Sequence, residues 1–155
     1  MNPNDPDSPQ RSAQPSLGTS GAPDAQVRAS AGRILVVDDE PNVRLTVAQM
    51  LRIFGYEVAE AASGAAALAL VRSTEFDLVV SDIRMPGMDG YETFRAIRAL
   101  RPGIRGVAMT GFADDASPRT AQDAGFVRLV RKPFTFKTLL EAIEATLDPN
   151  RDTSR

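Results

Sequence analysis

Short apolar runs alternate along the chain with segments in which apolar residues recur at helical spacing. The apolar runs predict strands at residues 34–37, 57–61, 77–81, 106–109 and 127–130. The segments between and after them predict helices at 41–54, 64–71, 90–100, 118–124 and 135–147. Five strand–helix units with short connections are typical of a parallel sheet covered by helices on both faces.

The core-facing side of three predicted helices can be assigned from spacing alone. The inward positions expected are Val43, Val47, Met50, Leu51 and Phe54, then Phe94, Ile97 and Leu100, then Leu139, Leu140, Ile143 and Leu147. Right-handed crossovers and a core of this size favour an α/β, flavodoxin-like, doubly wound five-stranded sheet. The expected strand order is 2-1-3-4-5.

The two ends of the chain differ in composition from the middle. Residues 1–32 are rich in Pro, Ser, Gly and small polar residues, which predicts a disordered N-terminal arm. Residues 33–148 form the predicted domain, and residues 149–155 form a short C-terminal tail. No apolar stretch is long enough for a membrane span.

Composition narrows the possible chemistry. The chain contains no cysteine and no histidine, which excludes disulfides, histidine-dependent nucleophile systems and zinc held by His or Cys. Any metal must be a hard cation bound by oxygen atoms, such as Mg²⁺, Ca²⁺ or Mn²⁺. A net charge of −2 gives no indication of nucleic acid or membrane as a partner. The absence of cysteine fits a cytoplasmic protein.

Polar residues that could take part in catalysis or binding follow four of the five predicted strands. Asp38 and Asp39 follow the first strand, Asp82 the third, Thr110 the fourth and Lys132 the fifth. Each alone has a plain structural interpretation, such as a helix entry, a turn, a strand end or a surface cation. Because these strands are neighbours in the expected order, their carboxyl ends open onto one crevice.

The charges of this set indicate what it can do. Three carboxylates in one pocket repel one another, so we expect a raised pKa in at least one of them or a bound cation. Mg²⁺ suits such a site and would neutralise a phosphoryl group that reaches Asp82. The carboxylate of Asp82 can then act as a nucleophile. Lys132 offers a positive charge, and Thr110 a hydroxyl donor, to phosphoryl oxygens.

These motifs resemble the receiver domain of bacterial two-component response regulators over about residues 33–147. The residues that carry the resemblance are Asp38-Asp39, Asp82 with Met85-Pro86-Gly87-Met88-Asp89-Gly90, Thr110-Gly111 and Lys132-Pro133-Phe134. The resemblance implies Mg²⁺-dependent phosphorylation of Asp82 by a phosphohistidine on a sensor histidine kinase. It implies that Asp39, Asp82 and the backbone carbonyl of Arg84 bind the metal, with Asp38 acting through water. Lys132 and Thr110 would hold the phosphoryl oxygens, and a cis peptide bond would precede Pro133.

One position departs from the family. Receiver domains often carry Tyr or Phe three residues before the lysine, and Leu129 occupies that position here. Phosphorylation is therefore expected to alter mainly residues 110–117. Only Pro149 to Arg155 follow the last helix, which predicts a stand-alone receiver, not a conventional enzyme, that signals through protein contacts on its fourth and fifth strand–helix units. No direct binding to nucleic acid is expected.

Three other functions are alternatives to this one. A phosphorelay intermediate would pass its phosphoryl group to a histidine phosphotransfer protein. Haloacid-dehalogenase-type phosphatases also form an aspartyl phosphate, but they place the nucleophile and an acid two residues apart after the first strand. Asp38 and Asp39 are adjacent here, and the candidate nucleophile follows the third strand. A flavin-binding module lacks support, because no phosphate-binding Ser/Thr/Gly loop follows the first strand.

Overall fold

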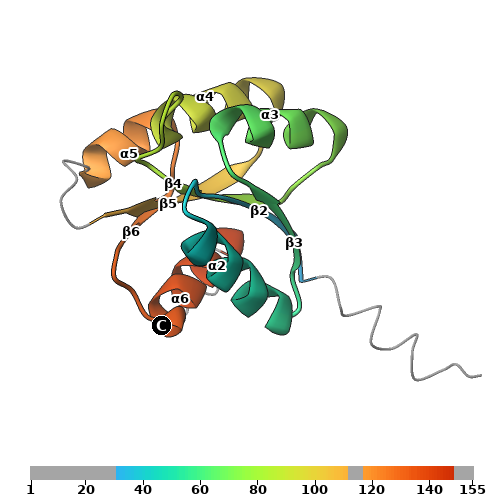
Figure 1. Ribbon diagram of the computed structural model, residues 1–155, viewed down its shortest axis with the longest axis vertical. Helices are drawn as coiled ribbons and strands as arrows, with labels where there is room; N and C mark the ends of the chain where they lie inside the picture. The colour runs from blue at the N-terminus through green and yellow to red at the C-terminus, as the bar shows by residue number, and fades with distance from the viewer. Residues whose placement is uncertain (1–30, 112–116, 149–155) are drawn as a thin grey trace, which may run out of the picture. The chain divides into compact units, whose positions relative to one another are not determined.

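A computed structural model of the protein describes residues 31–111 and 117–148. Within these residues, five strands form one parallel sheet (Figure 1). The strands are β2 (Arg33–Val37), β3 (Glu57–Ala61), β4 (Leu78–Asp82), β5 (Arg105–Thr110) and β6 (Arg128–Arg131). Their order across the sheet is β3-β2-β4-β5-β6, which confirms the predicted 2-1-3-4-5 order and the flavodoxin-like fold.

Helices cover both faces of this sheet. The helices are α2 (Pro41–Ile53), α3 (Gly64–Ser73), α4 (Gly90–Leu100), α5 (Pro118–Ala124) and α6 (Phe136–Leu147). Figure 1 shows α2 and α6 on one face and α3, α4 and α5 on the other. Each layer has its own apolar core, since alternate residues of a strand point to opposite faces. In β2, for example, Ile34 and Val36 pack toward α2, and Leu35 and Val37 pack toward α3.

The entry to α4 is built tightly against the end of β4. Asp89 caps the helix: its carboxylate accepts the N–H of Glu92 at 2.9 Å, and the Glu92 carboxylate accepts the N–H of Asp89 at 3.0 Å. The next residue, Gly90, lies so close to the backbone of Asp82 and Ile83 that a Cβ atom would overlap with both. A glycine is therefore required where α4 begins.

The predicted core positions are confirmed except at two helix ends. Phe54 is 52% exposed, because α2 stops at Ile53 and Phe54 leaves the helical spacing. Tyr56 is buried in its place and packs against the α2 and α6 side of the sheet. Leu100 is 42% exposed at the last position of α4. Hydrophobic residues in the last turn of a helix need not face the core, and helical spacing alone does not show where the helix ends.

Several strand boundaries differ from the prediction by one residue. Strands β2 and β5 begin one residue earlier than expected, and β5 and β6 end one residue later, so that Thr110 is the last residue of β5. Strand β4 begins at Leu78, because the carboxylate of Asp77 accepts the N–H of Arg33 at 2.8 Å and lies outside the strand. It ends on Asp82, so this residue belongs to the strand and does not follow it. Strand β6 begins at Arg128, and Val127 is exposed.

The predicted tail and all but the last two residues of the predicted N-terminal arm lie outside the described residues. The same holds for residues 112–116, where part of the phosphorylation response was expected. None of the helices in the described segments is long and apolar enough to cross a membrane.

Candidate functional site

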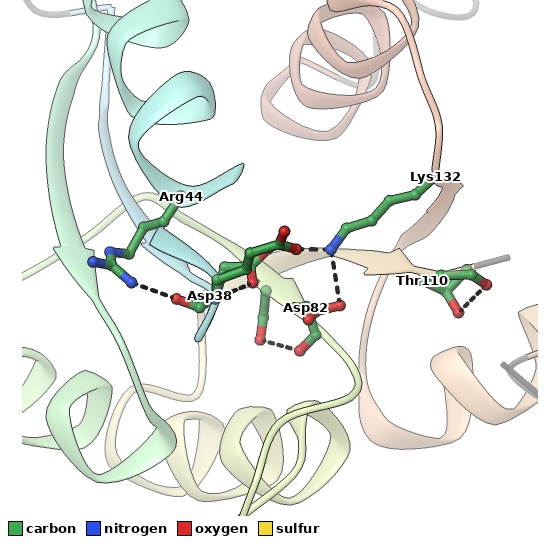
Figure 2. A network of polar contacts seen from close by, with 8 residues as sticks. Asp38, Arg44, Asp82, Thr110 and Lys132 are labelled. Atoms are coloured by element: carbon green, nitrogen blue, oxygen red, sulfur yellow. Dashed lines mark hydrogen bonds and ion pairs between the residues drawn. The ribbon is translucent and has the colours of Figure 1, made fainter. Parts of the chain in front are cut away.

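The strand ends that carry the predicted chemistry meet at one edge of the sheet. Asp82 pairs with Met109 of β5, and Thr110 is the next residue along that strand. Lys132 follows β6, and its backbone N–H donates to the carbonyl of Thr110 at 2.7 Å. Figure 2 shows Asp82 between Asp38 and Thr110, as expected for β4 lying between β2 and β5.

Three carboxylates converge at this edge. One oxygen from each of Asp38, Asp39 and Asp82 can be chosen so that all three lie within 4.8 Å of one another. Asp38 is fully buried and Asp82 is 6% exposed, whereas Asp39 is exposed. The turn after β2 is held by two hydrogen bonds: the N–H of Glu40 donates to Asp38 Oδ1 at 2.9 Å, and the N–H of Asp38 donates to the carbonyl of Ala61 at 3.1 Å.

Lys132 bridges two of the carboxylates. Its Nζ lies 3.2 Å from Asp38 Oδ2 and 3.4 Å from Asp82 Oδ1 (Figure 2). Burial lowers the pKa of the Lys132 amino group, but the negative charges of Asp38 and Asp82 outweigh this and raise the pKa above its usual value of 10.5. Lys132 therefore remains a cation at neutral pH and offsets part of the carboxylate repulsion.

The surroundings of Asp82 change the pKa of its carboxyl group. Burial, followed by repulsion from Asp38, raises the pKa of Asp82 from its usual 3.8 to about 6, although Lys132 acts in the opposite direction. Crowding of carboxylates was the expected cause of a raised pKa in this pocket; the pKa of Asp82 is raised, but burial contributes more to this than repulsion from Asp38 does. At neutral pH Asp82 is still mostly ionised, which a nucleophilic carboxylate requires.

The remaining predicted site residues are placed as follows. Thr110 is fully buried, and its hydroxyl is directed toward the carbonyl of Gly111 at 3.5 Å (Figure 2). Arg84 lies two residues beyond β4 with an exposed side chain. The peptide bond between Lys132 and Pro133 is cis, as the family resemblance implied. Leu129 is partly buried and packs on the α3, α4 and α5 side of the sheet.

An open groove of about 580 Å³ lies beside Lys132, between the beginning of α2 and the segment after β6. Its lining is mainly apolar and includes Val43, Val47, Pro133 and Phe134. The groove lies next to the charged site, and sequence patterns alone did not indicate it.

Sequence reasoning also missed Arg44 in α2. Its guanidinium donates to the backbone carbonyl of Asp38 at 2.8 Å (Figure 2). An arginine on the polar side of a helix is usually taken as solvated, and its spacing from Asp38 carries no motif. The contact can be recognised only when the position of α2 against the end of β2 is known.

The carboxylate cluster fits a magnesium ion. All three side chains offer oxygen atoms, and the chain has no histidine or cysteine that would favour a softer metal. Mg²⁺ commonly keeps several water ligands beside one or two carboxylates, so a partly exposed cluster that includes Asp39 is suitable.

Comparison with known proteins agrees with this geometry. Residues 34–144 match the family model described as the response regulator receiver domain. A response regulator receiver domain protein from Methanospirillum hungatei JF-1 has a similar structure, with a TM-score of 0.72 and 34% identity, covering 80% of this chain and 99% of that one. The chain belongs to the response regulator receiver domain family, and its function lies in two-component phosphorelay signalling.

Two relatives illustrate the range of proteins that contain this domain. The transcriptional regulatory protein ZraR of Salmonella typhimurium is 42% identical over 120 residues, which cover 77% of this chain and 27% of that protein. The chain thus spans about a quarter of the length of that relative. Sporulation initiation phosphotransferase F of Bacillus subtilis is 30% identical, with 74% of this chain and 93% of that protein covered.

The titration of Asp82 predicts how stability depends on pH in the absence of metal. Because the pKa of Asp82 is about 6 in the folded chain and near 3.8 when unfolded, the folded state binds more protons between these values. The contribution of Asp82 to the free energy of unfolding therefore falls as pH rises through this window. We expect a loss of roughly 1–2 kcal/mol, after screening by solvent is allowed for.

Urea unfolding of the wild type and of Asp82→Asn, without Mg²⁺, measures this contribution. The variant has no carboxyl group to titrate at this position, so it should become progressively more stable than the wild type as pH rises from about 4 to about 7. A stability difference that stays constant over this range would contradict the raised pKa.

Removal of one carboxylate should weaken metal binding. We expect Asp39→Ala to reduce the affinity for Mg²⁺ by about tenfold or more, because a charged oxygen ligand is lost. The same change should raise the melting temperature of the metal-free protein, since one of three mutually repelling charges is removed. Thermal melts with and without Mg²⁺ test both effects. A metal-induced shift equal to that of the wild type would place the metal elsewhere.

Proposed function

We propose that Asp82 is the phosphoryl acceptor of this receiver domain. The donor would be a phosphohistidine on a sensor histidine kinase or on a histidine phosphotransfer protein. The observation that carries this proposal is the surroundings of Asp82: a nearly buried carboxylate with a lysine ammonium at 3.4 Å and two further carboxylates beside it. Membership of the receiver family supports the same assignment.

The proposed transfer is a displacement at phosphorus. A carboxylate oxygen of Asp82 attacks the phosphorus atom, and a P–O bond forms as the P–N bond to the donor histidine breaks. The electron pair of that bond returns to the imidazole nitrogen, and the product is an acyl phosphate on Asp82. This domain would promote its own phosphorylation and the later hydrolysis of the acyl phosphate, without acting as a conventional enzyme.

The other site residues have distinct proposed roles. Asp39, Asp82 and the backbone carbonyl of Arg84 would bind Mg²⁺, and Asp38 would act through water. When bound, the ion neutralises negative charge on the phosphoryl oxygens. Lys132 already lies between Asp38 and Asp82, so its ammonium can contact a phosphoryl oxygen without a large movement.

The hydroxyl of Thr110 would provide a further hydrogen bond to the phosphoryl group. It is directed toward Gly111 in this structure, so a rotation of the side chain or a shift of the following segment would accompany phosphorylation. The resulting change of surface would alter contacts with a target protein on the face formed by β5, α5, β6 and α6. We propose that this exchange takes place in the cytoplasm.

Similarity to sporulation initiation phosphotransferase F keeps a second role open, in which the phosphoryl group is passed on to a histidine phosphotransfer protein. The haloacid-dehalogenase-type phosphatase is not favoured, because the family model covers residues 34–144 and the candidate nucleophile ends the third strand of the sequence.

Incubation with acetyl phosphate tests the proposal, with Mg²⁺ or with a chelator present. Intact-mass measurement should show one phosphoryl adduct per chain in the presence of Mg²⁺ and almost none with the chelator. No adduct under either condition would contradict the proposal. Continuous release of phosphate from a range of small esters, without an adduct, would support the phosphatase instead.

A further inference from the structure

The first turns of α2 bring the guanidinium of Arg44 to the end of β2, next to the carboxylate cluster. Arg44 is partly buried, and its Nη1 donates to the backbone carbonyl of Asp38 at 2.8 Å. That carbonyl belongs to the peptide unit that joins Asp38 to Asp39. The hydrogen bond therefore fixes the orientation of the peptide from which the exposed carboxylate of Asp39 extends.

A second contact holds Arg44 in this position. Its Nε lies 3.4 Å from Glu60 Oε1 on β3, and the other oxygen of Glu60, Oε2, lies 3.4 Å from the guanidinium of Arg52. Arg52 also donates to the carbonyl of Val58 at 3.0 Å. Glu60 thus anchors two arginines of α2 to the neighbouring strand, and only Arg44 extends from this anchor to Asp38.

We infer that Arg44 is a positioning residue for the metal site, held by Glu60 and acting through the Asp38–Asp39 peptide. The inference rests on the proposed function, because it requires the carboxylate cluster to bind Mg²⁺. Asp38 is fixed by burial and by Lys132, whereas Asp39 is exposed and depends on its backbone for its direction. Groups that orient a ligand in this way commonly change metal affinity by 10- to 100-fold when removed.

The charge of Arg44 and its hydrogen bond to Asp38 predict opposite effects of removing Arg44 on the affinity for Mg²⁺. A guanidinium close to the site repels a cation, so its removal would strengthen Mg²⁺ binding if charge were the dominant effect. If Arg44 holds the peptide in place, its removal must weaken binding, because the carboxylates have to be ordered when the ion arrives. The direction of the change therefore separates the two effects.

Arg52 supplies a matched control. It belongs to the same helix, carries the same charge and contacts the same Glu60, but it extends to Val58 and not to Asp38. Isothermal titration with Mg²⁺ alone, without a phosphoryl donor, compares the two variants. We expect Arg44→Ala to raise the dissociation constant about tenfold and Arg52→Ala to change it less than about twofold.

Hydrogen exchange of the metal-free protein gives a readout that does not depend on the ion. The Glu40 amide, which donates to Asp38 Oδ1, should exchange faster in Arg44→Ala and at the wild-type rate in Arg52→Ala. If Arg44→Ala does not fold, Arg44→Lys serves in its place. It keeps the charge but lacks the planar set of donors that reaches both partners, so weaker binding is again expected.

The outcomes separate this inference from the proposed function. Unchanged or tighter Mg²⁺ binding in the Arg44 variant, or equal effects of the two arginine variants, would overturn the positioning role while leaving the metal site intact. A wild-type chain that binds no Mg²⁺, or whose binding is unaffected by Asp39→Ala, would overturn the proposed site and the inference together.

Discussion

Asp82→Asn is expected to abolish phosphoryl incorporation from acetyl phosphate while the fold is retained. Asparagine has nearly the same shape as aspartate, so the packing at the end of β4 should survive, but the amide lacks the nucleophilic charge. The loss should be complete within the sensitivity of intact-mass measurement. Circular dichroism and a thermal melt of the same sample establish that the variant is folded.

Asp123→Asn provides a control for this substitution. Asp123 lies on an exposed position of α5, away from the sheet edge where the carboxylates meet, and the change is chemically identical. The control should take up the phosphoryl group at the wild-type rate. A full adduct on Asp82→Asn would show that another residue is the acceptor.

Loss of the ammonium at Lys132 should have the second largest effect. We expect Lys132→Met to slow phosphoryl incorporation by roughly 100-fold, because the transferring group loses a positive charge placed beside Asp82. The pKa of Asp82 should also rise above about 6, since Lys132 now lowers it. The rate of adduct formation, measured across a range of pH, reports both effects.

The conservative variant distinguishes charge from shape. Lys132→Arg keeps the positive charge, but a planar guanidinium needs more room than the compact ammonium that fits between Asp38 and Asp82. Incorporation should be partly retained, and the response to phosphorylation should be impaired. Lys137→Arg, at an exposed position of α6, should behave as wild type. A Lys132→Met rate equal to that of the wild type would remove Lys132 from the proposed mechanism.

Much of the fold could be predicted because its strands are buried on both faces. A run such as Leu78–Val80 has no polar alternation, which distinguishes it from a surface strand. Helix ends were harder. At Phe54 and Leu100 the periodicity continues beyond the point at which the backbone still directs side chains into the core.

The site could be predicted as far as it depends on strand ends. Asp38, Asp82 and Lys132 each follow or end a strand, and the strand order alone brings them together. The contact between Arg44 and the carbonyl of Asp38 could not be predicted in this way. It depends on the distance between a helix and a strand end, which sequence periodicity does not specify.

The groove beside Lys132 could not be predicted from the sequence either. The groove beside Lys132 forms only when the beginning of α2 approaches the segment after β6. Two of its apolar residues, Val43 and Val47, have a spacing that also fits an ordinary core position.

Locating the modification shows directly whether Asp82 accepts the phosphoryl group. The wild-type chain is phosphorylated with acetyl phosphate and Mg²⁺, reduced with borohydride to trap the acyl phosphate, and digested for tandem mass spectrometry. We expect the reduced residue to be Asp82. Reduction at Asp38, Asp39 or any other carboxylate, with Asp82 unmodified, would contradict it.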